Sequence, residues 1–141
     1  MIGRSSTKSQ TLEESSPLTE DQIAVIMKDP FKIGTFFLKY RQFRDPAIRF
    51  VWVSVEGDRL CWSKPGEKHL RTEVRGFVRI SDIKRIKDGL DRTRGLPKEN
   101  KELRLACSFT VYASDKTIEL EAPTEKVKKD WVNHLCTLVN I

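Results

Sequence analysis

The fold of this chain is decided by residues 36–53, which read Phe36-Phe37-Leu38-Lys39-Tyr40-Arg41, then Gln42-Phe43-Arg44-Asp45-Pro46-Ala47-Ile48, then Arg49-Phe50-Val51-Trp52-Val53. Two runs rich in aromatic and β-branched residues flank a short polar segment that holds a proline. This pattern predicts a β-hairpin with a loop of moderate length.

Alternation along the two predicted strands assigns their side chains to faces. The even-numbered apolar residues are expected to face the core, and they are Phe36, Leu38, Tyr40, Phe50 and Trp52. The odd-numbered cations Lys39, Arg41 and Arg49 would then share the opposite face, beside a loop that adds Arg44. Because like charges on adjacent strands repel one another, this face is either an anion site or a solvated surface. Alternation alone leaves both interpretations open.

The composition indicates a single globular domain with an acidic partner. The chain has 141 residues, of which 38% are hydrophobic and 33% charged, and its formal net charge is +6. A basic balance of this kind favours nucleic acid or an anionic membrane surface. The three cysteines show no C-x-x-C spacing, so a disulfide framework or zinc site is not expected and a reducing compartment is favoured. The chain contains neither a long apolar run nor a secretory signal.

The chain divides into three predicted parts. Residues 1–18 are polar and aperiodic and are expected to be disordered. Residues 19–30 are expected to hold a short helix, because Thr19 and Gln22 have capping-box spacing and Asp29-Pro30 ends the apolar stripe. Residues 31–141 form the domain itself.

Further strands follow the hairpin. They are predicted at 59–63, 76–80, 83–86, 103–112 and 117–122, with a polar loop over 88–101. Because no strand in this series is followed by a helix, the sheet should be antiparallel. A long helix then begins after Thr124, and Val127, Trp131, Leu135 and Leu138 share one of its faces. This helix is expected to close one end of a curled barrel, with Trp131 as a core anchor.

The order of these elements resembles a pleckstrin homology (PH) domain over about residues 33–140. The resemblance implies a mainly β fold, a seven-stranded antiparallel barrel or sandwich capped by a C-terminal helix. It is nearest to PH domains of the phospholipase C delta type, and it is also similar to acylated PH-domain proteins of apicomplexan parasites that read phosphatidic acid. The residues that carry it are Gly34–Lys39, Arg49–Trp52, Leu60–Trp62, Ile80–Ile83, Ser108–Val111, Ile118–Pro123 and Trp131.

The resemblance also implies a headgroup site at the open end of the barrel. Lys39 and Arg49 match basic positions of the family motif, and Arg41 matches the extra basic residue of the phospholipase C delta type. Ala47 stands at the usual middle basic position, which weakens the case for a polyphosphorylated inositol and favours a simpler phosphomonoester. Lys64 and Lys68 lie on the loop that completes such a pocket in the family.

Residues at the loop tip suggest direct membrane contact. Phe43 lies between Arg41 and Arg44, and an aromatic flanked by cations can enter the membrane interface. The alternative is that Phe43 packs against its own hairpin. Five cations at roughly 1 kcal/mol each give a dissociation constant on the order of 0.1–1 mM, so we expect a second anchor such as acyl groups upstream.

We therefore expect a monomeric, peripheral membrane module on the cytosolic face of a membrane, such as that of a secretory organelle. Its predicted partner is an anionic phospholipid, either phosphatidic acid or a phosphoinositide. The alternative is a PH-like scaffold that binds another protein without specific lipid binding. No catalytic motif, metal site or cofactor is expected, and nucleic-acid binding is not favoured because no base-stacking motif accompanies the charge.

Overall fold

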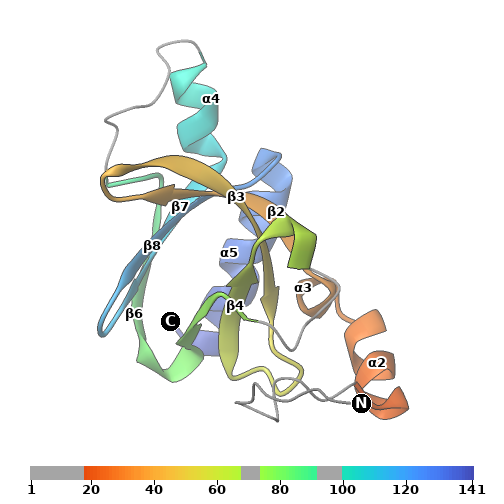
Figure 1. Ribbon diagram of the computed structural model, residues 1–141. Coiled ribbons are helices and arrows are strands. Elements are labelled where there is room, and N and C mark those ends of the chain that lie inside the picture. The colour runs from red at the N-terminus through yellow and green to blue at the C-terminus, as the bar shows by residue number, and fades with distance from the viewer. Residues whose placement is uncertain (1–17, 68–73, 92–99) are drawn as a thin grey trace.

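The computed structural model of the chain describes residues 18–67, 74–91 and 100–141. Within them lies one seven-stranded sheet in the order β5-β4-β3-β2-β8-β7-β6, and all the neighbouring strands are antiparallel (Figure 1). This confirms the predicted mainly β fold. The strands are β2 (Thr35–Arg41), β3 (Arg44–Val53), β4 (Arg59–Ser63), β5 (Gly76–Arg79), β6 (Ile83–Asp88), β7 (Ser108–Ala113) and β8 (Thr117–Glu121).

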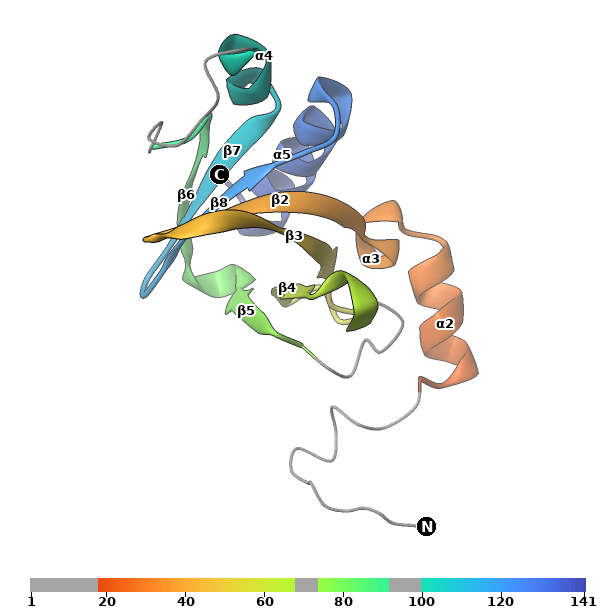
Figure 2. The same cartoon turned by 45° about the horizontal axis from the view of Figure 1, so that its top comes forward.

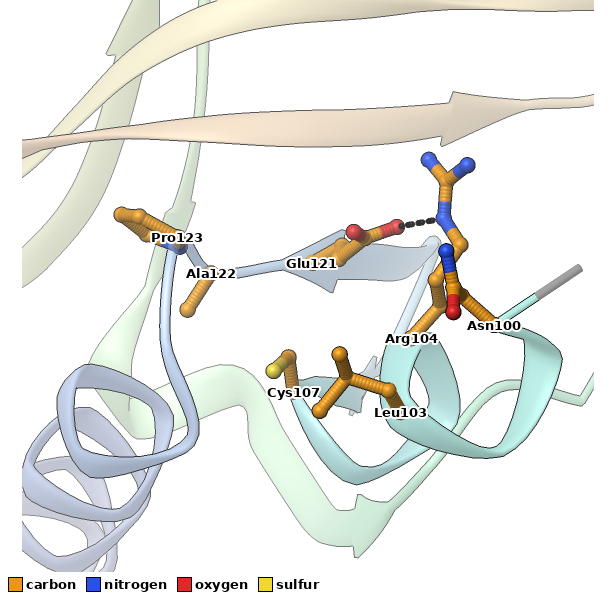
Figure 3. A pocket seen from close by; sticks show the side chains of 7 residues that line it. All are labelled: Asn100, Leu103, Arg104, Cys107, Glu121, Ala122 and Pro123. Carbon is orange, nitrogen blue, oxygen red and sulfur yellow. Dashed lines mark hydrogen bonds and ion pairs between the residues drawn. The ribbon is translucent and has the colours of Figure 1, made fainter.

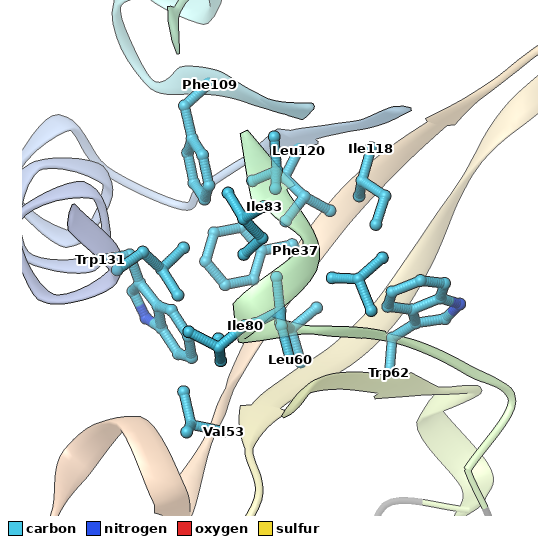
Figure 4. Close-up of a cluster of buried hydrophobic side chains, with 14 of the residues drawn as sticks. Phe37, Val53, Leu60, Trp62, Ile80, Ile83, Phe109, Ile118, Leu120 and Trp131 are labelled. Atoms are coloured by element: carbon cyan, nitrogen blue, oxygen red, sulfur yellow. The ribbon is translucent and has the colours of Figure 1, made fainter. Parts of the chain in front are cut away.

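The predicted C-terminal helix is α5 (Glu125–Val139), and it supplies one wall of the core. The Thr124 side chain accepts a hydrogen bond from the Val127 backbone N–H, as expected of an N-cap. Trp131 and Leu135 are buried in the main core cluster, which Figure 4 shows between the helix and the curled sheet. The core anchor predicted at Trp131 is thus confirmed.

Edge-to-face aromatic contacts join this helix to the first strand. The Phe37 ring lies 5.4 Å from the Trp131 ring and 5.9 Å from the Phe109 ring, centroid to centroid. The Trp131 indole N–H also donates to the Thr35 hydroxyl, over 3.2 Å. Such contacts stabilise the fold by more than the apolar area that they bury, so they hold β2 firmly against α5.

The N-terminal helix α2 (Glu20–Met27) begins with the predicted capping box, because Thr19 and Gln22 each accept a hydrogen bond from the other's backbone N–H. A further turn, α3 (Pro30–Ile33), was not predicted. It forms because Asp29 caps it and Pro30 occupies its first position, where a missing N–H costs nothing.

The structure corrects the predicted faces of the hairpin. The odd-numbered residues Phe37, Val51 and Val53 lie in the main core, whereas Phe50 and Trp52 belong to a second cluster on the other face. The reason is that both faces are apolar here: Phe50 and Trp52 are covered by contacts that include Cys61 on the next strand. Hydrophobic alternation therefore could not identify the inner face, and Lys39 and Arg49 continue the inner rows instead of opposing them.

The loop of the hairpin is also shorter than predicted. Only Gln42 and Phe43 separate the two strands, and Arg41 pairs with Arg44 directly. Pro46 therefore lies within β3 and not in a loop.

The strand predicted over 103–112 is wrong in its first half. Residues Lys101–Ala106 form the helix α4, and β7 begins only at Ser108. Leucine, arginine and alanine in this segment are good helix formers, and this local propensity prevails over the alternating pattern. The remaining short elements are the 3₁₀ turns η2 (Pro65–Glu67) and η3 (Ile80–Asp82).

Candidate anion-binding site

Strand pairing brings two turns to one end of the sheet, here called the open end. The β2–β3 turn follows Arg41, and β8 runs antiparallel to β2 with Lys39 opposite Leu120 and Tyr40 opposite Glu119. The β7–β8 turn therefore projects in the same direction as the hairpin tip, as Figure 2 shows on the left of the view.

Lys39 and Arg49 lie on the inner face of this hairpin. Phe37, which is 2% exposed, pairs with Arg49, and Lys39 follows Phe37 by two residues on the same face. The Lys39 ammonium lies 5.2 Å from the centroid of the Trp62 ring, which lines the main core. Both cations thus stand where the apolar core ends and the open end begins, which is an arrangement suited to an anion.

Arg41 has a different environment. Its Nε and Nη2 groups donate to the Asp45 backbone carbonyl oxygen at 2.8 and 2.6 Å, so that it braces the hairpin across the turn. Two of the Arg41 side-chain donor groups are therefore used to hold the shape of the hairpin tip.

Phe43 occupies the tip itself. It is 92% exposed and has a φ of 62°, a left-handed conformation that is uncommon for a bulky residue. The interpretation in which Phe43 packs against its own hairpin is therefore wrong. Arg44 beside it is exposed as well.

Two lysines of the loop after β4, Lys64 and Lys68, are predicted to contact the headgroup. Lys64 is exposed and directly follows β4. Lys68 lies outside the described residues.

Lys116 also lies at the open end, although the sequence did not identify it as a site residue. It lies in the β7–β8 turn, where its ammonium donates to the Phe77 carbonyl at 3.2 Å and stands 5.7 Å from the centroid of the Trp62 ring. The turn itself was predicted from Ala113–Lys116, but its proximity to Lys39 depends on strand order. No local signal in the sequence contains that information.

A hollow of about 430 Å³ lies elsewhere, beside α4 on the outer face of the sheet (Figure 3). Within it the Glu121 carboxylate accepts hydrogen bonds from the Tyr40 hydroxyl at 2.6 Å and from Arg104 Nε at 3.1 Å. Burial, followed by the bond to Glu121, raises the pKa of Tyr40 well above its ordinary value. This closed polar network stabilises the attachment of α4, and it is separate from the inward-facing cations.

Within the described residues, no group of three or more His, Cys, Asp or Glu side chains is placed to hold a metal ion. Nor is any of the described helices long and apolar enough to cross a membrane.

Comparison with known proteins gives the family of the chain. A family model described as meiotic cell cortex C-terminal pleckstrin homology matches residues 22–141. The chain is also similar in structure to the PH domain of human oxysterol binding protein-related protein 11, with 17% identity and a TM-score of 0.56 over 75% of this chain and 78% of that one. Comparison with curated protein sequences gave no match.

Two further solved structures share the fold. The PH domain from TgAPH is 10% identical, with a TM-score of 0.58 over 84% of this chain and 90% of that one. S. officinalis PLC21 is 16% identical, with a TM-score of 0.60 over 79% of this chain but only 16% of that one. The predicted PH fold is therefore confirmed, while the two finer resemblances stay predictions.

Proposed function

Because the chain belongs to the meiotic cell cortex C-terminal pleckstrin homology family, we propose that it is a membrane-targeting module that binds an anionic phospholipid headgroup at its open end. Lys39, Arg49 and Lys64 would contact headgroup phosphate, with Lys68 as a further predicted contact. Arg41 shapes the tip through Asp45 and offers its remaining N–H groups to the lipid. Phe43 and Arg44 would touch the membrane first.

One observation carries this proposal: Lys39 and Arg49 continue the two inward-facing rows of β2 and β3 just beyond the last core residues. A cation in that position is partly shielded from water on its core side, where Trp62 stands 5.2 Å from the Lys39 ammonium. Charge interactions are stronger in such surroundings than on a fully solvated strand. This supports a headgroup site over a merely solvated face.

The exposed tip supplies a second, apolar contribution. Each cation near an anionic leaflet contributes about 1 kcal/mol, and an aromatic ring that enters the interface adds to that. Phe43 already points outward from a two-residue turn in the structure, so the ring is placed to meet the bilayer. The two contributions act together at one end of the molecule.

Vesicle sedimentation tests the proposal. The wild-type protein should pellet with vesicles that contain phosphatidic acid or a phosphoinositide, and Lys39→Glu and Arg49→Glu should each abolish most of this pelleting. Lys126→Glu on α5 is the matched control, because Lys126 is an exposed cation far along the chain from the hairpin. Equal loss in the control, or full binding by both hairpin variants with intact folding, would count against the proposed site.

Protein docking is a second candidate function, favoured by apolar surface on the outer face of the hairpin. Phe36 and Ile48 are 41% and 54% exposed, although both belong to strands of the central sheet. A docking module need not pellet with vesicles, so the same assay separates the two functions.

A further inference from the structure

We propose that the outward backbone side of β6 (Ile83–Asp88), here called the β6 edge, binds an acidic, extended peptide segment of a partner protein, which joins the sheet as an added strand. This surface is distinct from the proposed lipid site. β6 begins opposite Ala113, beside the β7–β8 turn, and leads away from the open end along the side of the sheet.

The position of β6 at the end of the strand order leaves one of its sides without a neighbouring strand among those described (Figure 1). The other terminal strand, β5, has four residues, and the carbonyl of Phe77 on it already accepts a hydrogen bond from the Lys116 side chain. β6 has six residues, and four of them are exposed. β6 is therefore the better of the two terminal strands for receiving another strand.

The hydrogen bonds to β7 show which backbone groups point outward from the β6 edge. The Gly89 N–H donates to the Ser108 carbonyl at 2.8 Å, in continuation of the β6–β7 register. Because residues of an antiparallel pair bond their partner alternately, Lys87 also bonds β7, whereas Ile86 and Asp88 direct their N–H and C=O groups away from it. Within the described residues no hydrogen bond reaches these four groups. They are placed to bond an added strand.

The side chains along the β6 edge favour an acidic strand. Three exposed cations lie on β6, namely Lys84, Arg85 and Lys87. The nearby carboxylates are already paired, because Asp88 contacts Lys128 Nζ at 2.9 Å and Asp91 contacts Lys87 Nζ at 2.5 Å. Cations on an edge strand oppose pairing with a second copy of the same edge, and the repulsion becomes attraction when the added strand is acidic.

The two faces of β6 predict the sequence pattern of the peptide. Ile86 and Val132 of α5 are half-buried and pack against the main core cluster. Arg85 and Lys87 lie on the opposite face of β6, where the Arg85 guanidinium stands 4.4 Å from the centroid of the Tyr112 ring. Since side chains of an added strand also alternate, its apolar residues would meet Ile86 and its acidic residues would meet the two cations.

Fluorescence anisotropy of the full chain with a labelled probe peptide tests the proposal. The probe is Gly-Glu-Val-Glu-Val-Glu-Val-Gly with both ends blocked. A second peptide has lysine in place of every glutamate, and a third groups the same residues as Gly-Glu-Glu-Glu-Val-Val-Val-Gly. The alternating acidic probe should bind about tenfold more tightly than the lysine peptide and about threefold or more tightly than the grouped one.

Charge-matched variants locate the binding site. Lys84→Gln combined with Lys87→Gln should weaken binding of the acidic probe about fivefold or more. Lys28→Gln combined with Lys126→Gln is the control, because it removes two exposed cations from α2 and α5 and changes the net charge equally. The control should change the affinity by less than about twofold.

Amide NMR during titration with the acidic probe tests strand addition itself. The backbone N–H signals of Ile86 and Asp88 should shift and exchange more slowly with solvent, whereas the exchange of the Lys87 N–H, already bonded to β7, should change little. Failure of the acidic probe to bind, equal binding of the grouped peptide, equal weakening by both double variants, or shifts centred away from β6 would each overturn the proposal. These results do not depend on vesicles, so the lipid site stands or falls separately.

Discussion

Replacing Phe43 by asparagine should stabilise the protein and at the same time weaken its binding to anionic membranes. Phe43 sits at the hairpin tip with a φ of 62° and with 92% of its surface exposed. Its side chain therefore contributes almost nothing to packing, while its backbone adopts a conformation that disfavours a bulky residue.

The two effects can be sized from this geometry. A left-handed backbone costs an ordinary residue about 1–2 kcal/mol, and asparagine tolerates it, so the free energy of unfolding should rise by roughly 1 kcal/mol. Burying a phenylalanine side chain is worth about 1.5–3 kcal/mol, so losing its entry into the membrane interface should weaken vesicle binding by roughly tenfold or more.

Denaturant unfolding measures the first effect and vesicle sedimentation the second. Phe43→Leu is the matched control: it retains an apolar side chain and the same backbone strain, so it should keep both stability and most of the binding. If Phe43→Asn gains stability but binds vesicles as tightly as the wild-type protein, the tip does not enter the membrane. If it loses stability, the argument from the backbone conformation is wrong.

Three further predictions concern the stability of the fold. The His134 ring stacks on the Phe31 ring, with 3.9 Å between the ring centroids, and burial lowers the pKa of His134. The contribution of His134 to stability is therefore present above its unfolded pKa of about 6.5 and is lost as the pH falls below that value. His134→Phe should reduce the decline in Tm that is measured between pH 7 and pH 5. Gly76→Ala should lower the free energy of unfolding by about 1–3 kcal/mol in denaturant titrations, because the new Cβ overlaps the Trp62 ring. Because the pKa of Tyr40 is raised in the folded protein, stability should fall as the pH rises above about 10, and Tyr40→Phe should lessen that fall in unfolding measured at pH 9 and 11.

Much of the fold follows from local patterns. The capping box at Thr19, the apolar stripe through Trp131 and the short strand at Arg59–Ser63 each have one physical interpretation, and the structure contains all three. Such features depend on neighbours three or four residues away, which the sequence displays directly.

The failures arise where two interpretations satisfy the same local pattern. Phe36 and Phe37 are both apolar, so only contact with Trp131 shows that Phe37 faces the core. Leu103 and Leu105 alternate as a strand would, yet helix propensity places them in α4.

In the candidate site, too, local patterns predict some features and miss others. Lys39 and Arg49 were grouped correctly on one face, although the face was misassigned. Lys116 could not be found, since its approach to Trp62 depends on the pairing of β2 with β8 across most of the chain.

The most direct test of the central claim is to map which end of the protein approaches a bilayer. Spin-labelled lipids in vesicles containing phosphatidic acid should broaden the amide NMR signals of Lys39, Phe43 and Lys116 most strongly, and should leave those of α2 and the exposed face of α5 unaffected. Broadening centred on α2 or α5, with the hairpin tip unaffected, would contradict the account.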